Sequence, residues 1–420
     1  MHVCVIGAGV MGLTTAYFLQ AEGHSVTVVD CAAGPGMGAS RANGAQLSYS
    51  FVAPLADASV PPKLLSLIFG RDSPLKFHPR IEPAQWRWGL AFLRVANTEA
   101  ARATTAALLR LAELSREFIE PLIEGEGIAC HFTRGGKLVV YPDQASLAAA
   151  RAQVEYQATL GSVQKILDAD ACVLQEPALA PYREKIVGGV WTPTEAAADS
   201  GAFCDQLARL LAERGVAFDF GRAVQRFDVA GGEVRAALGA PAAGGAATPL
   251  RADAYVLANG AAAPALAATA GLALPVYPLK GYSITVKPVG STLPLASITD
   301  TRRKVVFAPL GDRVRVAGFV EIGGHPTDIP AARIGALLGA AREVLGYQTV
   351  DGDLAPWAGL RPATPSGRPL LGRTPLRNLY LNVGQGTLGW TLAAGSARLV
   401  CDAIAGRAPT IDIAPFTLSV

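Results

Sequence analysis

MHVCVIGAGVMGLTTAYFLQAEGHSVTVVD, residues 1–30, is the stretch that decides the fold. Its apolar run at residues 3–6 predicts a buried parallel strand, because a strand covered on both faces is apolar along its whole length. The pattern that follows predicts a helix over residues 10–22 and a second strand over residues 25–29. A strand, a helix and a strand in this order indicate the first unit of an α/β sheet.

A glycine-rich turn joins the first strand to the helix. Its glycines have the spacing G-x-G-x-x-G: Gly7 permits the tight turn, Gly9 lets a pyrophosphate approach the backbone, and Gly12 lets the helix pack against the strand. The free N–H groups at the start of the helix then face the phosphates. Asp30 ends the second strand, where its carboxylate is placed to accept hydrogen bonds from a ribose diol. The stretch therefore predicts a dinucleotide-binding unit.

Composition excludes several classes of protein. The chain has 420 residues, half of them apolar, with 45 glycines and 29 prolines, which is typical of a turn-rich α/β enzyme large enough for two domains. A formal net charge of +3 without a block of basic residues argues against a nucleic-acid partner. The six cysteines and five histidines have no metal-ligand spacing, so we expect free thiols and no metal site.

The sequence carries no pattern of a secreted or membrane-spanning protein. Its first apolar run belongs to the nucleotide fold rather than to a signal peptide, so we expect a cytoplasmic protein. Residues 51–77 are apolar with a few basic side chains, and they are too interrupted to span a bilayer. Two interpretations of this stretch stay open: peripheral contact with a membrane surface, and an ordinary loop and helix.

After Asp30 the chain leaves the nucleotide fold and later returns to it. Helices are expected over residues 84–95, 98–124, 144–160 and 331–345, a strand over 135–142, and a helix followed by a strand over 199–221. A further strand over residues 253–260 ends at Asn259 and Gly260, a second turn that lies against a dinucleotide. Beyond residue 275 the alternating pattern predicts an antiparallel sheet with a hairpin turn at Gly311.

A second glycine-rich turn lies near the end of the chain, in LNVGQGTLGWTLAAGSARLV, residues 381–400. A short apolar strand runs into Gly384, Gly386 and Gly389, and an alanine-rich helix follows. A nicotinamide cofactor does not need a second glycine-rich turn of this kind to bind it. The break in the run of βα units after Asp30 also argues against a nicotinamide dehydrogenase.

With these motifs the chain resembles the D-amino-acid oxidase superfamily of flavoproteins, and most of all its bacterial D-amino-acid dehydrogenase branch, the small-subunit type. The resemblance covers nearly the whole chain. It rests on five motifs in the family's order: the first glycine turn with Asp30, SRANGAQLS (40–48), VYPLKGYS (276–283), GLRPATPSGRPLLGRT (359–374) and GQGTLGWT (384–391).

The resemblance implies an α/β fold in which a Rossmann-like FAD-binding domain of the glutathione-reductase type is interleaved with an antiparallel-sheet α+β substrate domain. The FAD-binding domain would be discontinuous and comprise residues 1–50, 196–274 and 352–420. The substrate domain would comprise residues 51–195 and 275–351.

The resemblance also implies that FAD is the cofactor. The first turn would hold the pyrophosphate, and the second would present N–H groups and a helix N-terminus to the pyrimidine edge of the flavin, where negative charge gathers on reduction. No histidine or cysteine stands in a flavin-contacting motif, so we expect noncovalent binding. The predicted cofactor-binding residues are Gly7, Gly9, Val10, Met11, Gly12, Asp30, Ser40, Arg41, Asn43, Gly44, Gln46, Val224, Asn259, Gly260, Gly384, Gln385, Gly386, Thr387, Leu388 and Gly389.

Four residues are predicted for the substrate side. Arg361 matches the family's carboxylate-binding arginine, whose planar guanidinium grips a carboxylate through two hydrogen bonds. Tyr282 matches a tyrosine on the strand over the flavin, and its hydroxyl would reach the same carboxylate. Lys280 is placed either near the flavin or in solvent, and Tyr49 is a candidate lid residue.

The chain departs from the branch at two positions. Gln385 stands where the branch has histidine, which puts the reactivity of the flavin rim in doubt. Ser366 stands where the branch has aspartate, and this change concerns a turn.

The implied reaction is the oxidative deamination of a D-amino acid to a 2-oxo acid and ammonia, by hydride transfer to flavin N5. The branch implies that a quinone or another non-oxygen acceptor takes the electrons. Two alternatives stay open: an oxidase or dehydrogenase of glycine, sarcosine or a cyclic amino acid such as proline, and a non-catalytic flavin-binding redox sensor. The preferred side chain and the oligomeric state cannot be read from the sequence.

Overall fold

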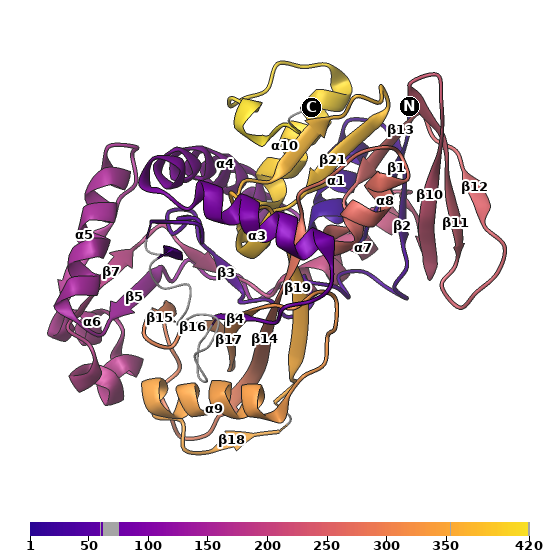
Figure 1. Cartoon of the computed structure of the whole chain (residues 1–420). Helices are drawn as coiled ribbons and strands as arrows, with labels where there is room; N and C mark the ends of the chain where they lie inside the picture. The colour runs from indigo at the N-terminus through magenta and orange to yellow at the C-terminus, as the bar shows by residue number, and fades with distance from the viewer. Residues whose placement is uncertain (59, 62–74, 353, 419–420) are drawn as a thin grey trace.

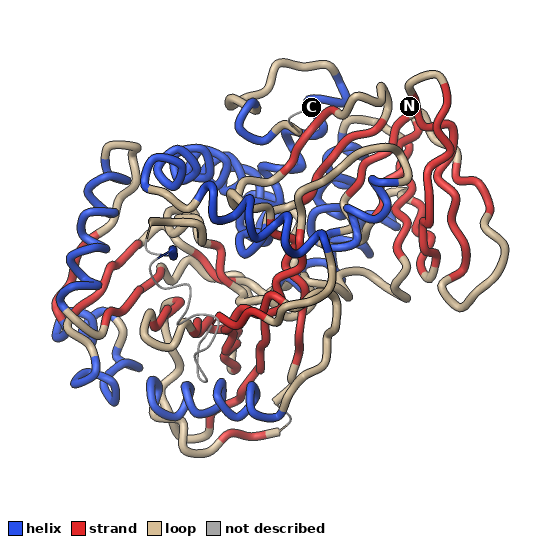
Figure 2. The backbone as a smooth tube through the Cα atoms, in the orientation of Figure 1, coloured by secondary structure: helices blue, strands red, loops and turns tan. Residues whose placement is uncertain are grey.

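The computed structural model describes residues 1–58, 60–61, 75–352 and 354–418 (Figure 1). Part of the stretch 51–77, whose composition allows a membrane contact, therefore lies outside the described residues. Within the described part of the chain, no helix combines the length and the apolar composition needed to cross a bilayer. Strands from distant parts of the chain gather into two main sheets (Figure 2).

The first sheet has six strands in the order β20-β21-β13-β1-β2-β9. They are β1 (His2–Ile6), β2 (Ser25–Asp30), β9 (Ala217–Phe220), β13 (Ala254–Leu257), β20 (Leu370–Arg373) and β21 (Leu379–Val383). All neighbours pair in parallel except β20 and β21, which are antiparallel. Central β1 lies between β2 and β13, so the turns after these three strands meet at one edge of the sheet, where such folds bind ligands.

Strand β1 is buried on both faces, as its apolar sequence predicts. Val3 and Val5 belong to the core formed with helices α1 (Val10–Ala21), α4 (Thr98–Gly125), α7 (Ser200–Glu213) and α10 (Gly389–Ala405). Cys4 and Ile6 belong to a second core on the opposite face. That core also contains residues of α8 (Ala263–Ala268) and of the three-stranded sheet β10 (Arg222–Ala230), β11 (Glu233–Pro241) and β12 (Thr248–Leu250).

The second sheet has ten strands, and its main path runs β18-β14-β17-β16-β15-β5-β7-β6. Its strands are β4 (Leu75–Phe77), β5 (Lys137–Tyr141), β6 (Lys165–Asp168), β7 (Gly188–Thr192), β14 (Tyr277–Pro288), β15 (Ser297–Asp300), β16 (Val305–Leu310), β17 (Arg313–Ile322), β18 (Val350–Asp351) and β19 (Trp357–Ala363). The predicted hairpin is confirmed, because β16 and β17 pair antiparallel around Gly311, which has φ +65°. Helix α9 (Ala331–Leu345) packs on this sheet (Figure 1).

The remaining elements connect and cover the sheets. They are α3 (Pro83–Val95), α5 (Gln144–Ala158), α6 (Ala169–Gln175), the strand pair β3 (Gln46–Leu47) and β8 (Ala196–Ala197), and the 3₁₀ turns η1 (Pro177–Lys185), η2 (Gly260–Ala262), η3 (Gly386–Leu388) and η4 (Ala414–Phe416). Side chains at the N-caps fix several helix starts: Asn97 accepts from the Ala100 N–H and Asp143 from the Ser146 N–H. The mixed α/β fold expected from the sequence is confirmed.

Strand pairing crosses the predicted domain boundary between residues 351 and 352. Strand β19 follows residue 352, which the prediction assigned to the cofactor domain, yet it pairs along its whole length with β14 of the ten-stranded sheet. We keep the division at residues 50, 195, 274 and 351 as a proposal, in which β19 is shared between the two domains.

Candidate functional site

A cavity of about 1450 Å³ is lined by residues from both main sheets. It exceeds the roughly 300–1,000 Å³ of pockets for drug-sized ligands, so a dinucleotide and a small substrate fit together. Most of the predicted cofactor residues line it: Gly7, Gly9, Val10, Met11, Asp30, Ser40, Asn43, Gly44, Gln46, Val224, Asn259, Gly260, Gln385, Gly386, Thr387, Leu388 and Gly389. Gly12, Arg41 and Gly384 are not part of its lining.

The first glycine turn is built as its spacing predicts. Gly7 has φ +115°, and a Cβ at this position would lie 2.5 Å from the Ala258 carbonyl oxygen, so only glycine fits. A Cβ on Gly12 would overlap with the Gly7 carbonyl, so Gly12 serves the close packing of helix on strand rather than the cavity wall. Asp30 braces the turn, because its carboxylate accepts from the N–H groups of Ala8 at 2.7 Å and Ala32 at 2.8 Å.

The start of helix α1 is open toward the cavity. Its N-cap residue, Gly9, supplies no side-chain cap. The Val10 N–H donates to the Ser40 hydroxyl oxygen at 3.0 Å, and Gly9 and Ser40 both line the cavity. The N–H groups at this helix end can therefore bind the phosphates of a dinucleotide.

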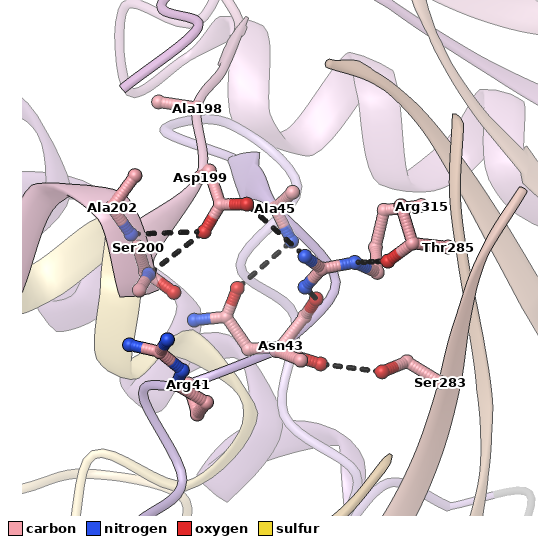
Figure 3. A network of polar contacts seen from close by, with 12 residues as sticks. Arg41, Asn43, Ala45, Ala198, Asp199, Ser200, Ala202, Ser283, Thr285 and Arg315 are labelled. Atoms are coloured by element: carbon pink, nitrogen blue, oxygen red, sulfur yellow. Dashed lines mark hydrogen bonds and ion pairs between the residues drawn. The ribbon is translucent and has the colours of Figure 1, made fainter. Parts of the chain in front are cut away.

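The loop 41–46 is held in place by Arg315 of β17 (Figure 3). Its guanidinium donates to the Asn43 carbonyl at 3.0 Å, to Asp199 Oδ2 at 3.1 Å and to Thr285 Oγ1 at 2.8 Å. Ser283 of β14 adds a hydrogen bond to the Ala42 carbonyl at 2.6 Å. The ten-stranded sheet thus positions the loop whose residues line the cavity.

Two local features shape this loop. The Ala45 N–H donates to Asn43 Oδ1 at 2.9 Å, and Ala45 has φ +56°, a conformation that non-glycine residues seldom adopt (Figure 3). Arg41 points elsewhere: it pairs with Asp205 at 2.8 Å, and its side chain is 48% exposed. We therefore leave Arg41 out of the proposed cofactor site.

The second glycine turn leads into α10, whose start also has no side-chain cap. Gly384 has φ +88° and makes the turn without lining the cavity. Gln385 is buried, and its amide donates to Asn382 Oδ1 at 2.7 Å, so it braces the turn from within. The Thr391 hydroxyl accepts from the Ser48 N–H at 2.8 Å and joins α10 to the loop after β3.

Arg361 lies on β19 and lines the cavity. Among the described residues its guanidinium has one hydrogen bond, from Nη1 to the Phe319 carbonyl at 3.0 Å, which leaves N–H donors for a carboxylate. Burial lowers the pKa of Arg361 to about 10, so it stays charged at neutral pH.

A bulge in β17 aims the Phe319 carbonyl at Arg361. The register between β14 and β17 shifts between Lys280 and Tyr282, and Phe319 within the bulge has φ +64°. Bulges next to active sites commonly re-aim a backbone group. Left-handed φ values at non-glycine residues carry strain, and strain of this kind concentrates at functional sites.

Tyr282 and Lys280 face away from Arg361. Arg361 is opposite Leu279 in the register, so it shares a face with residues 279 and 281, while residues 280 and 282 lie on the other face. The Tyr282 hydroxyl bonds to Glu321 at 2.9 Å, and Lys280 pairs with Asp328 at 3.1 Å; neither lines the cavity. We therefore leave Tyr282 and Lys280 out of the proposed substrate site.

Tyr49 is placed in the core rather than at a lid. It is 2% exposed, belongs to the cluster between the six-stranded sheet and its helices, and does not line the cavity. Burial raises the pKa of its hydroxyl well above the usual value.

Lys137 lines the cavity and was not predicted from the sequence. It is buried at the start of β5, donates to Ser48 Oγ at 2.8 Å and lies 4.2 Å from the centroid of the Phe51 ring. Burial lowers its pKa to about 8, against the attraction of buried Glu195. The indication of this role in the sequence is that a lysine begins the otherwise apolar run KLVVY.

Helix α3 lines a further part of the cavity, which was not predicted from the sequence. Trp86, Trp88, Leu90 and Phe92 all line the cavity. The rings of Trp88 and Phe92, four residues apart on the helix, stack with centroids 5.2 Å apart.

Known proteins resemble this chain over its whole length. It is 44% identical to D-amino acid dehydrogenase 2 of Ralstonia nicotianae over 431 residues, covering 100% of both chains. It is 45% identical to D-amino acid dehydrogenase 2 of Pseudomonas aeruginosa, covering 98% of this chain and 96% of the other.

Solved structures share the fold at low sequence identity. Glycine oxidase from Geobacillus kaustophilus superposes with a TM-score of 0.78 at 21% identity, covering 99% and 98% of the two chains. L-Proline dehydrogenase from P. horikoshii gives 0.75 at 17% identity, covering 97% and 94%. Residues 2–403 match the DAO family, described as FAD dependent oxidoreductase. The cavity with its two glycine turns fits FAD, and the chain belongs to this family of FAD dependent oxidoreductases.

Proposed function

We propose that the chain is an FAD-dependent D-amino-acid dehydrogenase, which oxidises a D-amino acid to a 2-oxo acid and ammonia. The observation that carries the proposal is Arg361, which lies in the same cavity as both glycine turns and keeps N–H donors that no described residue occupies. The relatives at 44% and 45% identity bear the name D-amino acid dehydrogenase, which supports the same reaction.

The chain's own groups bind the cofactor and orient the substrate. N–H groups at the start of α1 hold the pyrophosphate, and those at the start of α10 favour negative charge on the cofactor. Noncovalently bound FAD supplies the acceptor for the hydride that leaves Cα. Arg361 holds the carboxylate through paired hydrogen bonds and fixes the position of Cα. Catalysis is then mainly orientation and electrostatics, and water hydrolyses the resulting imine.

We further propose that the electrons pass to a quinone or another non-oxygen acceptor, and that the protein contacts the inner membrane from the cytoplasmic side. Apolar side chains next to the cavity support this proposal. Trp86 and Leu90 are 50% and 57% exposed and line the cavity, and Ile81, just before α3, is fully exposed.

The experiment mixes the purified yellow protein anaerobically with D-amino acids, glycine, sarcosine and proline, and follows the visible flavin absorbance. Bleaching by D-amino acids alone supports the proposal. Bleaching by glycine, sarcosine or proline instead would favour an enzyme for those substrates. No bleaching by any of them would favour a redox sensor. Air and a short-chain quinone are then added separately, and faster reoxidation by the quinone supports a dehydrogenase.

A further inference from the structure

An apolar wall borders the carboxylate site. It consists of five side chains of one hydrophobic cluster that also line the cavity: Trp88, Phe92, Leu279, Val320 and Ile322. Leu279 is directly opposite Arg361 in the pairing of β14 and β19, and such opposite pairs have Cβ atoms about 5 Å apart. The wall thus begins next to the residue that would hold the substrate's carboxylate.

The wall is fixed in position. The Trp88 indole N–H donates to the Ala363 carbonyl at 2.8 Å, and Ala363 is two residues after Arg361 on the same strand. The Trp88 ring stacks on Phe92 and lies 6.0 Å from the Tyr277 ring. Trp88 therefore has a defined orientation relative to Arg361.

Two polar groups beside the wall, on Tyr277 and Gln85, are already paired within the protein. The Tyr277 hydroxyl bonds to Glu82 at 3.1 Å. The Gln85 amide accepts from the Arg80 N–H at 2.8 Å and donates to the His78 carbonyl at 2.9 Å. A charged or amide side chain against the wall would lose its water without gaining these partners, and such desolvation is costly.

We propose that this wall binds the side chain of the substrate, and that the enzyme prefers D-amino acids with large apolar side chains to D-alanine, D-aspartate and D-glutamate. The inference rests on the proposed function, because it takes the substrate's carboxylate to be held at Arg361. A side chain attached to the same Cα then reaches the neighbouring wall. Burying its carbon atoms there contributes to the free energy of binding in proportion to the apolar area removed from water.

The test measures anaerobic flavin reduction by D-alanine, D-2-aminobutyrate, D-norvaline and D-norleucine. The rate constant divided by the dissociation constant should rise about fourfold with each methylene, which is the effect of about 0.8 kcal/mol. Reduction by D-glutamate should be at least tenfold less efficient than by D-norvaline. Equal efficiency along the series, or a preference for D-glutamate, would overturn the proposal.

Two variants assign the effect to the wall. Trp88→Ala and Phe92→Ala should each lower the norleucine-to-alanine ratio severalfold, while reduction by D-alanine changes much less. Trp191→Ala is the matched control, because Trp191 packs against Gly136 and is not part of the cavity lining. It should leave the ratio unchanged. A ratio that the control lowers as much as Trp88→Ala does would contradict a role of the wall.

A binding measurement separates this inference from the proposed function. Acetate, butyrate and hexanoate lack the amine, and their binding is followed by the change in the flavin spectrum. Their dissociation constants should fall along the series in the wild type and fall less in Trp88→Ala. If the dissociation constants depend on chain length but no D-amino acid reduces the flavin, binding at the wall is supported and the proposed reaction is contradicted. If Trp88→Ala alters only reoxidation by a quinone, the wall binds the electron acceptor and the inference is wrong.

Discussion

Arg361 lies over Gly281, the residue of the neighbouring strand whose missing side chain makes room for the guanidinium. A Cβ at residue 281 would overlap with the Cζ and both Nη atoms of Arg361. The strand backbone at Gly281 does not have a left-handed φ, so the glycine is needed for space rather than for conformation. Two residues from different parts of the chain therefore determine where a carboxylate can bind.

Gly281→Ala should displace the guanidinium without removing it. We expect the KM for a D-amino acid to rise at least tenfold, while the affinity for FAD stays within about twofold, since the glycine turns are untouched. Steady-state kinetics and flavin fluorescence measure the two quantities. Gly335→Ala on α9 is the control, because no described atom outside the helix's own backbone lies within 4 Å of a Cβ there. An unchanged KM in Gly281→Ala would show that the position of Arg361 is not critical.

Arg361→Leu should raise the KM steeply, because it removes both hydrogen bonds to the carboxylate. Arg361→Lys should restore only part of the binding, since an ammonium cannot form the paired geometry. A KM in Arg361→Leu equal to that of the wild type would refute the assignment of this residue.

Arg315→Leu should loosen the loop that lines the cavity. The change removes the bonds to Asn43 and Asp199, and breaking such a buried pair costs about 3–5 kcal/mol of stability. We expect a lower melting temperature and at least tenfold weaker FAD binding, measured by thermal unfolding and fluorescence titration. Arg313→Leu, at an exposed position of the same strand, should change neither. Equal effects in the two variants would argue against this role for Arg315.

Lys137 should make stability depend on pH. Its pKa is about 8 in the folded chain, against 10.5 for an ordinary lysine. Between these values the unfolded chain binds more protons at this residue, so its contribution to the free energy of unfolding rises with pH, by about 3 kcal/mol in total. The penalty for the buried charge is thus fully present below pH 8 and lost by about pH 10.5.

Urea unfolding of the wild type and Lys137→Met at several pH values measures this contribution. The stability of the variant relative to the wild type should fall as the pH rises from 8 to 10.5. Lys165→Met, at an exposed position, is the control and should show no such trend. A constant difference between Lys137→Met and the wild type would show that Lys137 keeps an ordinary pKa.

The glycine motifs could be predicted from the sequence because local geometry explains them. Gly7 needs its positive φ and Gly12 needs its close approach, whatever the rest of the chain does. The helix expected over residues 331–345 likewise coincides with α9. Structure set by neighbouring residues in the sequence is therefore well predicted here.

The face of β14 that looks into the cavity could not be predicted. Residues 277–286 are all buried, so no alternation of polar and apolar side chains distinguishes Tyr282 from Gly281. The roles of Lys137 and Trp88 likewise depend on partners far along the chain, namely Ser48 and Ala363. Such contacts depend on how the two sheets pack, and this packing cannot be predicted from any single stretch of sequence.

A single pair of enantiomers tests the proposed reaction most directly. The purified protein is mixed anaerobically with D-methionine and, separately, with L-methionine, and the flavin absorbance is followed. We expect complete bleaching by D-methionine, none by L-methionine, and one equivalent of 2-oxo acid per flavin. Bleaching by the L-enantiomer, or by neither, would contradict the assignment of this chain as a D-amino-acid dehydrogenase.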